Sequence, residues 1–242
     1  MVGAVGEFSC CVSYSAAVGA QNCICRSSCY ASITGACNCI NECSPFAVIV
    51  GTRAGVGCTG CCVKNAILIG DSTCTNHSYS TALGKCSCAK RPYEIWQRTN
   101  GDVASPTGGI SGQGFIGLKR DNLAGTAGYL PLYVSEELSR EFEFPASKNS
   151  VLTFSAEVSG RTTAADFVVG FTISGIVRIY NSGANIALED IPEITQFGGD
   201  ADVDAVVDVG SSPLRLRIMV KDKVGRTMHW AASMRYAEIT QA

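Results

Sequence analysis

Cysteine is the residue type with the greatest chemical potential in this chain, and its distribution is uneven. All 14 cysteines lie between Cys10 and Cys88. Many of them stand at even offsets from a repeated glycine, which places their side chains on one face of an extended chain. We therefore expect a structural cysteine ladder made of Cys23, Cys25, Cys37, Cys39, Cys74, Cys86 and Cys88.

Three kinds of thiol chemistry fit such a ladder. Clustered thiolates favour zinc, but the spacing is Cys-x-Cys instead of the paired Cys-x-x-Cys of structural zinc sites, and His77 is the one histidine nearby. Disulfides between neighbouring coils are an alternative, although stacked strands lie about 4.8 Å apart and the Cβ atoms of a disulfide roughly 3.8 Å apart. The favoured interpretation is reduced thiols that fill a narrow interior as small apolar groups. No metal or cofactor is expected.

Other reactive residue types do not form a catalytic set. Cys74 and His77 lack a third orienting group, so we attribute their closeness to chance. Arg215 and Arg217 could bind an anionic glycan or simply line an exposed strand. An acidic row could hold calcium, but its alternation is typical of a solvated strand face; the row is Asp200, Asp202, Asp204 and Asp208. The chain is small and shows no pair of catalytic carboxylates, so we expect that it is not an enzyme, a glycan depolymerase included.

A repeated phrase indicates which elements position the cysteines. Its glycines follow one another at steps of 16, 16, 19 and 14 residues, which suits one coil of a β-solenoid. Both faces of the phrase are apolar or small, so one face should fill the inside of the roll. The other face should pack against another copy of the chain. The copies of the phrase are 14–19, 30–35, 46–51, 65–70 and 79–84.

Composition divides the chain into three regions. Residues 1–89 hold the cysteine-rich repeats, and 90–112 form a neck followed by a linker rich in Gly, Ser and Pro. Residues 113–242 show strand-like alternation, as in 152–158 and 214–220, separated by turn residues. The expected fold class is all-β, with an N-terminal parallel β-roll and a C-terminal antiparallel β-sandwich or barrel.

Charge and hydropathy exclude several classes of partner. The chain is 46% hydrophobic and 17% charged, with a net charge of −2, so it has no electrostatic basis for binding nucleic acid or an anionic membrane. No apolar run reaches the roughly 18 residues of a membrane span, and we expect no membrane insertion. The N-terminus lacks the basic region and apolar core of a signal peptide, which favours synthesis in a cytoplasm.

The repeated phrase resembles the Asn-Ser-Val-Ala-Ile-Gly repeat of trimeric autotransporter adhesin heads of the YadA-like type, with 65–70 as the nearest copy. The resemblance implies left-handed parallel β-rolls packed as a homotrimer. Bacteriophage virion proteins carry the same roll in a cysteine-rich form. The second half also resembles a domain that follows such rolls in phage proteins, through 93–98, 114–120 and 225–231. Tyr or Phe often replaces the first Asn, and the autotransporter stalk and anchor are missing, which favours the phage proteins.

The resemblance implies a virion structural protein: a trimeric tail fibre or tail spike, synthesised in the host cytoplasm, that serves host attachment and adhesion. Its partners would be its own copies, other virion proteins and a host surface receptor or glycan. A capsid decoration protein or head fibre is one alternative, and a fragment of a bacterial surface adhesin is another. Loops on a rigid β scaffold carry binding, so the candidate receptor-binding residues are Asn181, Asn185, Asp200, Lys221, Lys223 and Arg226.

Overall fold

The computed structural model divides into two compact units. The first is Met1–Ser105 with Gly112–Gly114, and the second is Pro106–Ser111 with Phe115–Ala242. All regular secondary structure in the described residues is β-strand, so the predicted all-β class is confirmed. The structure describes residues 2–8, 13–25, 27–41, 43–57, 63–89, 91–98, 110–121, 128–134, 141–144, 149–163, 167–181, 183–199, 202–211, 213–222 and 226–240.

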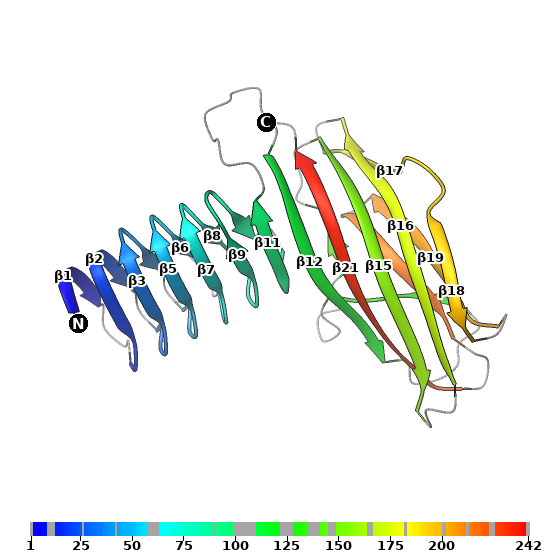
Figure 1. Ribbon diagram of the computed structural model, residues 1–242, viewed down its shortest axis with the longest axis horizontal. Helices are drawn as coiled ribbons and strands as arrows, with labels where there is room; N and C mark the ends of the chain where they lie inside the picture. Colours follow the sequence, from blue (N-terminus) through cyan, green and yellow to red (C-terminus); the bar gives the residue numbers. More distant parts are fainter. Residues whose placement is uncertain are drawn as a thin grey trace. The chain divides into compact units, whose positions relative to one another are not determined.

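The first unit is a β-solenoid, coloured blue to green in Figure 1. Its longer strands pair in parallel, each with the equivalent strand of the next coil. The repeat glycines are register partners, with Gly19 opposite Gly35 and Gly51 opposite Gly70. The longer strands are β1 (Val2–Phe8), β2 (Ala16–Ile24), β3 (Ser32–Ala36), β5 (Val48–Thr52), β7 (Ile67–Asp71), β9 (Thr81–Leu83) and β11 (Glu94–Arg98).

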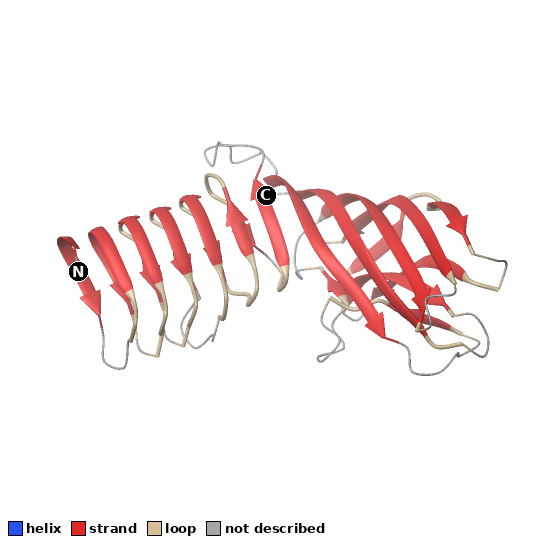
Figure 2. Cartoon of the chain, turned by 60° about the horizontal axis from the view of Figure 1, so that its bottom comes forward, coloured by secondary structure: helices blue, strands red, loops and turns tan. Residues whose placement is uncertain are grey.

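Short strands form a second parallel row, which begins at the end of β2 (Figure 2). Side chains from both rows fill the narrow interior of the roll. The fourth residue of each phrase is buried there, as Ile33, Ile49 and Leu68 illustrate, and Ile24 and Ile40 meet them from the second row. Each coil therefore buries its apolar residues only by stacking on its neighbours. The short strands are β4 (Cys39–Ile40), β6 (Gly55–Val56), β8 (Cys74–Thr75) and β10 (Cys88–Ala89).

The backbone requires the glycine that ends each phrase. Gly35 has a φ of 133°, and a Cβ built on it would lie 1.7 Å from the carbonyl oxygen of Gly51. Asn38 completes this corner, because its Nδ2 donates to the Gly51 carbonyl at 2.8 Å and its Oδ1 accepts from the Ala54 backbone N–H at 2.9 Å. Asn22 makes the first of these contacts one coil earlier, with Gly35 at 2.9 Å. Buried amides thus satisfy backbone groups of the following coil.

The roll extends past the last copy of the phrase. β11 pairs in parallel with β9, and Trp96 lies opposite Ala82. Tyr93 has a φ of 59°, as Tyr79 has 58° one coil earlier, and their rings stack with centroids 4.9 Å apart. The sequence analysis placed this segment in the neck and linker, 90–112, on the composition of that region. Its strand register makes it a further coil.

The second unit contains two antiparallel sheets. In the larger sheet β15 pairs along its length with β16 on one side and β21 on the other. β12 pairs with β21, while β17 and β18 both pair with β16. The strands are β12 (Ile110–Asp121), β15 (Ser150–Thr162), β16 (Val168–Tyr180), β17 (Asn185–Leu188), β18 (Glu193–Gly198) and β21 (Met228–Thr240).

The smaller sheet is built on β20, which pairs with β19, β13 and β14. Phe142 of this sheet meets Tyr236 of the larger sheet edge to face, with ring centroids 5.1 Å apart, so the two sheets share a core. Burial alternates along all of β15, as its period-two pattern predicts. The strands are β13 (Tyr129–Pro131), β14 (Phe142–Glu143), β19 (Asp204–Ser211) and β20 (Leu214–Lys221).

Candidate functional site

The outer side of the longer strands of the roll carries the strongest candidate surface. The third and fifth residues of each phrase point outward, because the fourth residue points into the roll. Large aliphatic groups occupy these outward positions in most of the coils, although Ser32 and Thr34 hold them in the coil of β3, and we call the aliphatic set the outer stripe. A set of exposed apolar side chains on one face of a protein often marks a binding surface. The stripe consists of Val18, Val50, Ile67, Ile69 and Ile95, each 41% to 46% exposed.

Aromatic side chains form a second exposed row at the first residue of the phrase. Tyr14 stacks on Tyr30 with centroids 5.1 Å apart, and Tyr30 stacks on Phe46 at 5.2 Å. Because the stacked rings cover one another's faces, this aromatic ladder presents mainly ring edges, which suits protein contact better than stacking on a sugar. These aromatic residues stand where the adhesin repeat has Asn, and this difference was visible in the sequence. Their recurrence at one phrase position would have predicted the ladder.

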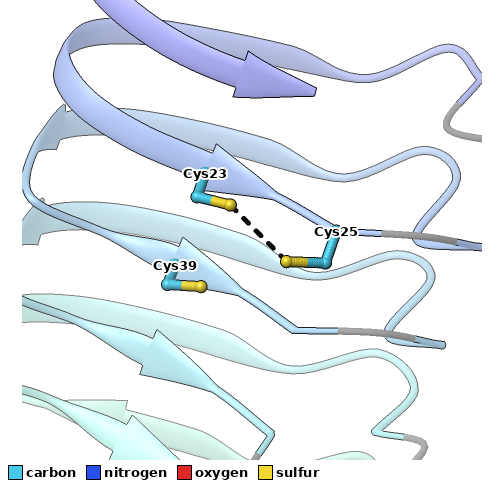
Figure 3. Close-up of side chains that lie close together, drawn as sticks. All are labelled: Cys23, Cys25 and Cys39. Carbon is cyan, nitrogen blue, oxygen red and sulfur yellow. Dashed lines mark hydrogen bonds between the residues drawn. The ribbon is translucent and has the colours of Figure 1, made fainter. Parts of the chain in front are cut away.

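Three of the ladder cysteines come together on the outside of the second row. Cys23 and Cys25 flank the buried Ile24, and Cys39 is the register partner of Cys23 in the next coil. The three Sγ atoms lie within 4.8 Å of one another, and Cys23 contacts Cys25 at 3.5 Å (Figure 3). Burial, followed by the hydrogen bond to Cys25 and the charges of neighbouring thiolates, raises the pKa of Cys23 to about 12. The expectation that these thiols fill the interior of the roll is wrong, because Ile24 occupies the interior and the flanking thiols are partly exposed.

The remaining ladder cysteines occupy two other environments. Cys74 and Cys88, partners across neighbouring coils, form a disulfide with their Cα atoms 4.6 Å apart. The disulfide takes the Cys74 thiol, so no nucleophile is left for a pair with His77. Cys37 and Cys86 stand at positive-φ corners instead, and the Cys37 thiol donates to the Gln21 side chain at 3.0 Å. The cysteines thus follow two positions of the coil, not one, and one pair is oxidised.

The predicted receptor-binding residues lie at opposite ends of the second unit. Asn181 and Asn185 lie where β16 ends and β17 begins, beside the start of β15. Lys221 is the last residue of β20 and Arg226 shortly precedes β21, which starts beside the end of β15. Gly198, at the end of β18, is also at this second end, opposite Val169 near the start of β16. Outside the described residues lie Asp200 and Lys223.

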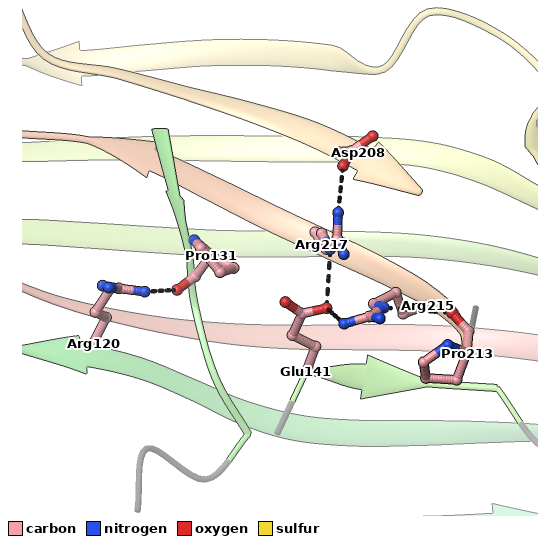
Figure 4. A network of polar contacts seen from close by, with 7 residues as sticks. All are labelled: Arg120, Pro131, Glu141, Asp208, Pro213, Arg215 and Arg217. Carbon is pink, nitrogen blue, oxygen red and sulfur yellow. Dashed lines mark hydrogen bonds and ion pairs between the residues drawn. The ribbon is translucent and has the colours of Figure 1, made fainter. Parts of the chain in front are cut away.

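The two arginines considered as glycan ligands are engaged by carboxylates. Glu141 accepts from Arg215 Nη1 at 2.8 Å and from Arg217 Nε at 2.9 Å (Figure 4). Arg217 also bonds Asp208 at 3.0 Å, and the hydrogen bond to Glu141 is the main cause that raises the pKa of Arg217. The sequence offered no sign of Glu141, which lies more than seventy residues away from its partners, at separations of 74 and 76. An exposed strand with compensated charge fits these arginines better than an anion site.

The acidic row does not converge on a cation site in the described part of the chain. Asp208 pairs with Arg217, and the Asp204 carboxylate accepts a hydrogen bond from the Tyr129 hydroxyl. Among the described residues, the only group of three or more metal-ligating side chains is the thiol cluster. His229 contacts Thr163 Oγ1 through Nε2 at 3.3 Å. These contacts do not resemble a catalytic arrangement.

Comparison with known proteins returns solved structures alone. No protein-family model and no curated protein sequence matches the chain. The tailspike protein of Acinetobacter baumannii phage AM24 aligns at 9% identity and a TM-score of 0.31, over 94% of this chain and 56% of that one. The tailspike protein of Acinetobacter phage vB_ApiP_P1 aligns at 9% identity and a TM-score of 0.28, over 96% and 54%.

A third structure is the tailspike protein gp49 of Acinetobacter baumannii bacteriophage Fri1, described as a capsular polysaccharide depolymerase. It aligns at 8% identity and a TM-score of 0.24, over 94% of this chain and 47% of that one. The chain therefore spans about half the length of the structures it matches. Within the described residues, no helix has the length and apolar character needed to span a bilayer.

Proposed function

We propose that this chain is a structural protein of a bacteriophage virion, a tail fibre or tail spike that assembles as a homotrimer. The observation that carries the proposal is the outer stripe, whose aliphatic side chains are almost half exposed in the single chain. Removal of apolar surface from water is the dominant favourable term in most protein association. The stripe therefore supports a permanent partner along the roll.

Another copy of the same chain is the best partner, because its apolar residues recur at the same spacing as those of the outer stripe. The rows of the stripe recur at the spacing of paired strands, about 4.8 Å. A copy rotated about an axis parallel to the stack presents rows at the same spacing, and rotation by equal steps closes a ring in which every stripe is covered. Three copies, and the left-handed sense of the coils, are what the resemblance to adhesin heads implies.

In this proposal the roll is the shaft and the second unit displays the host-binding tip. The outward groups of the roll are largely apolar, whereas the turns of the second unit carry amide and cationic side chains that can bond a glycan. The strand ends that flank two of the predicted binding segments, Gly198 of β18 and Met228 of β21, lie at one end of the larger sheet. We place the receptor site there, around Lys221 and Arg226, and not beside Asn181.

The oligomeric state is the first test of the proposal. Native mass spectrometry and sedimentation of the full chain should give three copies and no stable monomer. Labelling of intact particles with an antibody to the chain should then mark the tail. Label over the capsid would favour the decoration protein or head fibre, and a stable monomer would refute the homotrimer.

An enzymatic role needs its own test, because one of the matching tailspikes is described as a depolymerase. We expect this chain to bind host polysaccharide without shortening it, since the sequence showed no pair of catalytic carboxylates. Incubation with purified capsular polysaccharide, followed by chromatography of its chain length, measures this directly. Release of oligosaccharides would contradict the prediction.

A further inference from the structure

The thiol cluster on the second row of the roll has the composition of a metal site. Cys23 lies near the end of β2, Cys25 directly follows that strand, and Cys39 belongs to β4 in the next coil. The Cys-x-Cys spacing alone supplies only two of these ligands. Stacking of the coils supplies the third, because Cys39 is paired in register with Cys23.

We propose that Cys23, Cys25 and Cys39 bind one thiophilic cation, with Zn²⁺ as the ion. Zn–S bonds of about 2.3 Å in tetrahedral geometry hold sulfur atoms roughly 3.8 Å apart. In the structure Cys23 and Cys25 already contact at 3.5 Å, and all three Sγ atoms lie within 4.8 Å of one another. No pair of sulfur atoms therefore exceeds the bound separation by more than about 1 Å.

Three thiols leave one position of a tetrahedral zinc ion for a further ligand. Among the described residues no histidine, carboxylate or further cysteine joins the three thiols. Asn41 lies beside them, with its Oδ1 3.4 Å from Cys39 Sγ, and its Nδ2 donates to the carbonyl of Gly57. Since the amide is held with its oxygen towards the sulfurs, a water molecule that completes the tetrahedron would have an acceptor there.

Binding requires that the thiols lose their protons. A cysteine thiol is mostly protonated at neutral pH, because its ordinary pKa is about 8.5. A cation replaces these protons: one Zn²⁺ and three thiols give one zinc tris-thiolate and three free protons. Affinity should therefore rise steeply with pH between neutral and mildly alkaline conditions.

A disulfide is the competing fate of the same residues. Cys74 and Cys88 hold the equivalent position in two later coils and are joined in this way. Two residues after Cys74 the chain has Asn76, whereas two residues after Cys23 it has Cys25. The third thiol is therefore the feature that separates the proposed metal site from the disulfide site.

The test uses the full chain, purified without oxygen and chelator-treated, and titrated with Co²⁺ as a spectroscopic probe. We expect a cobalt–thiolate absorption band that saturates at one equivalent, disappears when Zn²⁺ is added, and is accompanied by three released protons. Cys39→Ser should lower the Co²⁺ affinity at least tenfold. Cys37→Ser is the matched control, because Cys37 is exposed at a corner and bonds Gln21, and it should leave the titration unchanged.

Three results would overturn the site. The first is absence of the band in the reduced chain. The second is an equal loss of the band in both variants. The third is a Cys23–Cys39 disulfide, found by mass spectrometry in protein whose thiols were blocked at the moment of lysis. The cluster lies within one chain, so none of these results depends on the homotrimer.

Discussion

Ile49 and Ile67 belong to neighbouring strands of the roll, yet their side chains lie on opposite sides of the sheet. Ile49 is paired with Leu68 in register and is fully buried inside the roll, whereas Ile67 is 41% exposed on the outer stripe. Ile49 therefore contributes to the core of the roll, whereas Ile67 contributes to an exposed surface. This difference separates folding from assembly in an experiment.

Ile67→Asp should leave the coil intact and abolish the homotrimer. An unpaired carboxylate buried in an interface costs several kcal/mol, and in the single chain this position is open to water. Ile49→Asp should instead unfold the roll, because the carboxylate would enter its interior. Circular dichroism and native mass spectrometry read the two effects separately, with Ile67→Leu as the control. A trimeric Ile67→Asp variant would show that the stripe isn't the interface.

Gly35→Ala should destabilise the roll by at least about 1–3 kcal/mol, the usual cost of a residue held in a strained backbone region. Its Cβ would collide with the Gly51 carbonyl, at a φ of 133° that alanine disfavours. Gly55→Ala is the matched control, since its nearest neighbour is the Cys39 carbonyl oxygen at 3.9 Å. Thermal unfolding of both variants checks the prediction, and equal melting temperatures would contradict it.

Reduction of the Cys74–Cys88 disulfide should lower stability by roughly 3 kcal/mol, the order expected for a closed loop of about this length. The bridge spans 14 residues and joins adjacent coils. Cys74→Ser should reproduce the loss and make the chain insensitive to reductant. Cys86→Ser, in the same coil but outside the bridge, should behave as the parent chain does. Chemical unfolding with and without reductant measures the difference.

Glu141→Gln should cost about 1–3 kcal/mol, the range for loss of hydrogen bonds to a charged group. Its carboxylate is only 10% exposed and holds both Arg215 and Arg217. The Asp208 side chain, the second partner of Arg217, is 50% exposed. Asp208→Asn should therefore change stability by less than about 0.5 kcal/mol. Urea unfolding of the two variants compares them, and an equal cost would refute the central role of Glu141.

Receptor binding should depend on the residues at one end of the second unit and not on those at the other. Replacement of Lys221 and Arg226 by alanine should weaken competition with phage adsorption at least tenfold, because loss of two contacts in each of three copies compounds through avidity. The paired replacement of Asn181 and Asn185 at the other end is the control and should compete like the parent chain. The reverse outcome would move the receptor site to the Asn181 end.

Most of the fold could be predicted from short periods in the sequence. The 16-residue step of the phrase predicts the solenoid, because each repeat glycine becomes the register partner of the next, as Gly19 and Gly35 are. Alternation over 152–158 likewise predicts the buried face of β15. These inferences succeed because both depend on local spacing, which stacking and sheet packing preserve.

Contacts between residues that lie far apart in the chain could not be predicted from the sequence. Trp96 was not recognised as an interior residue of the roll, because its coil ends in Arg98 without the diagnostic glycine. Glu141 meets Arg215 only through the pairing of β14 with β20. The third thiol of the cluster, Cys39, likewise joins Cys23 only when two coils stack. Local pattern specifies faces, and the tertiary fold specifies which faces meet.

The Asn22 and Asn38 corners have a consequence for the length of the roll. Each asparagine bonds the glycine of the next coil, so these two coils offer their successors the same partner. Removal of residues 30–45, one complete step, would join Cys29 to Phe46 and shorten the roll by about 4.8 Å while each remaining side chain kept its face. A deletion that is not a whole coil would instead break the register in which the repeat glycines are paired. Related proteins can therefore differ in reach by whole coils, with the surfaces at either end of the roll left unchanged.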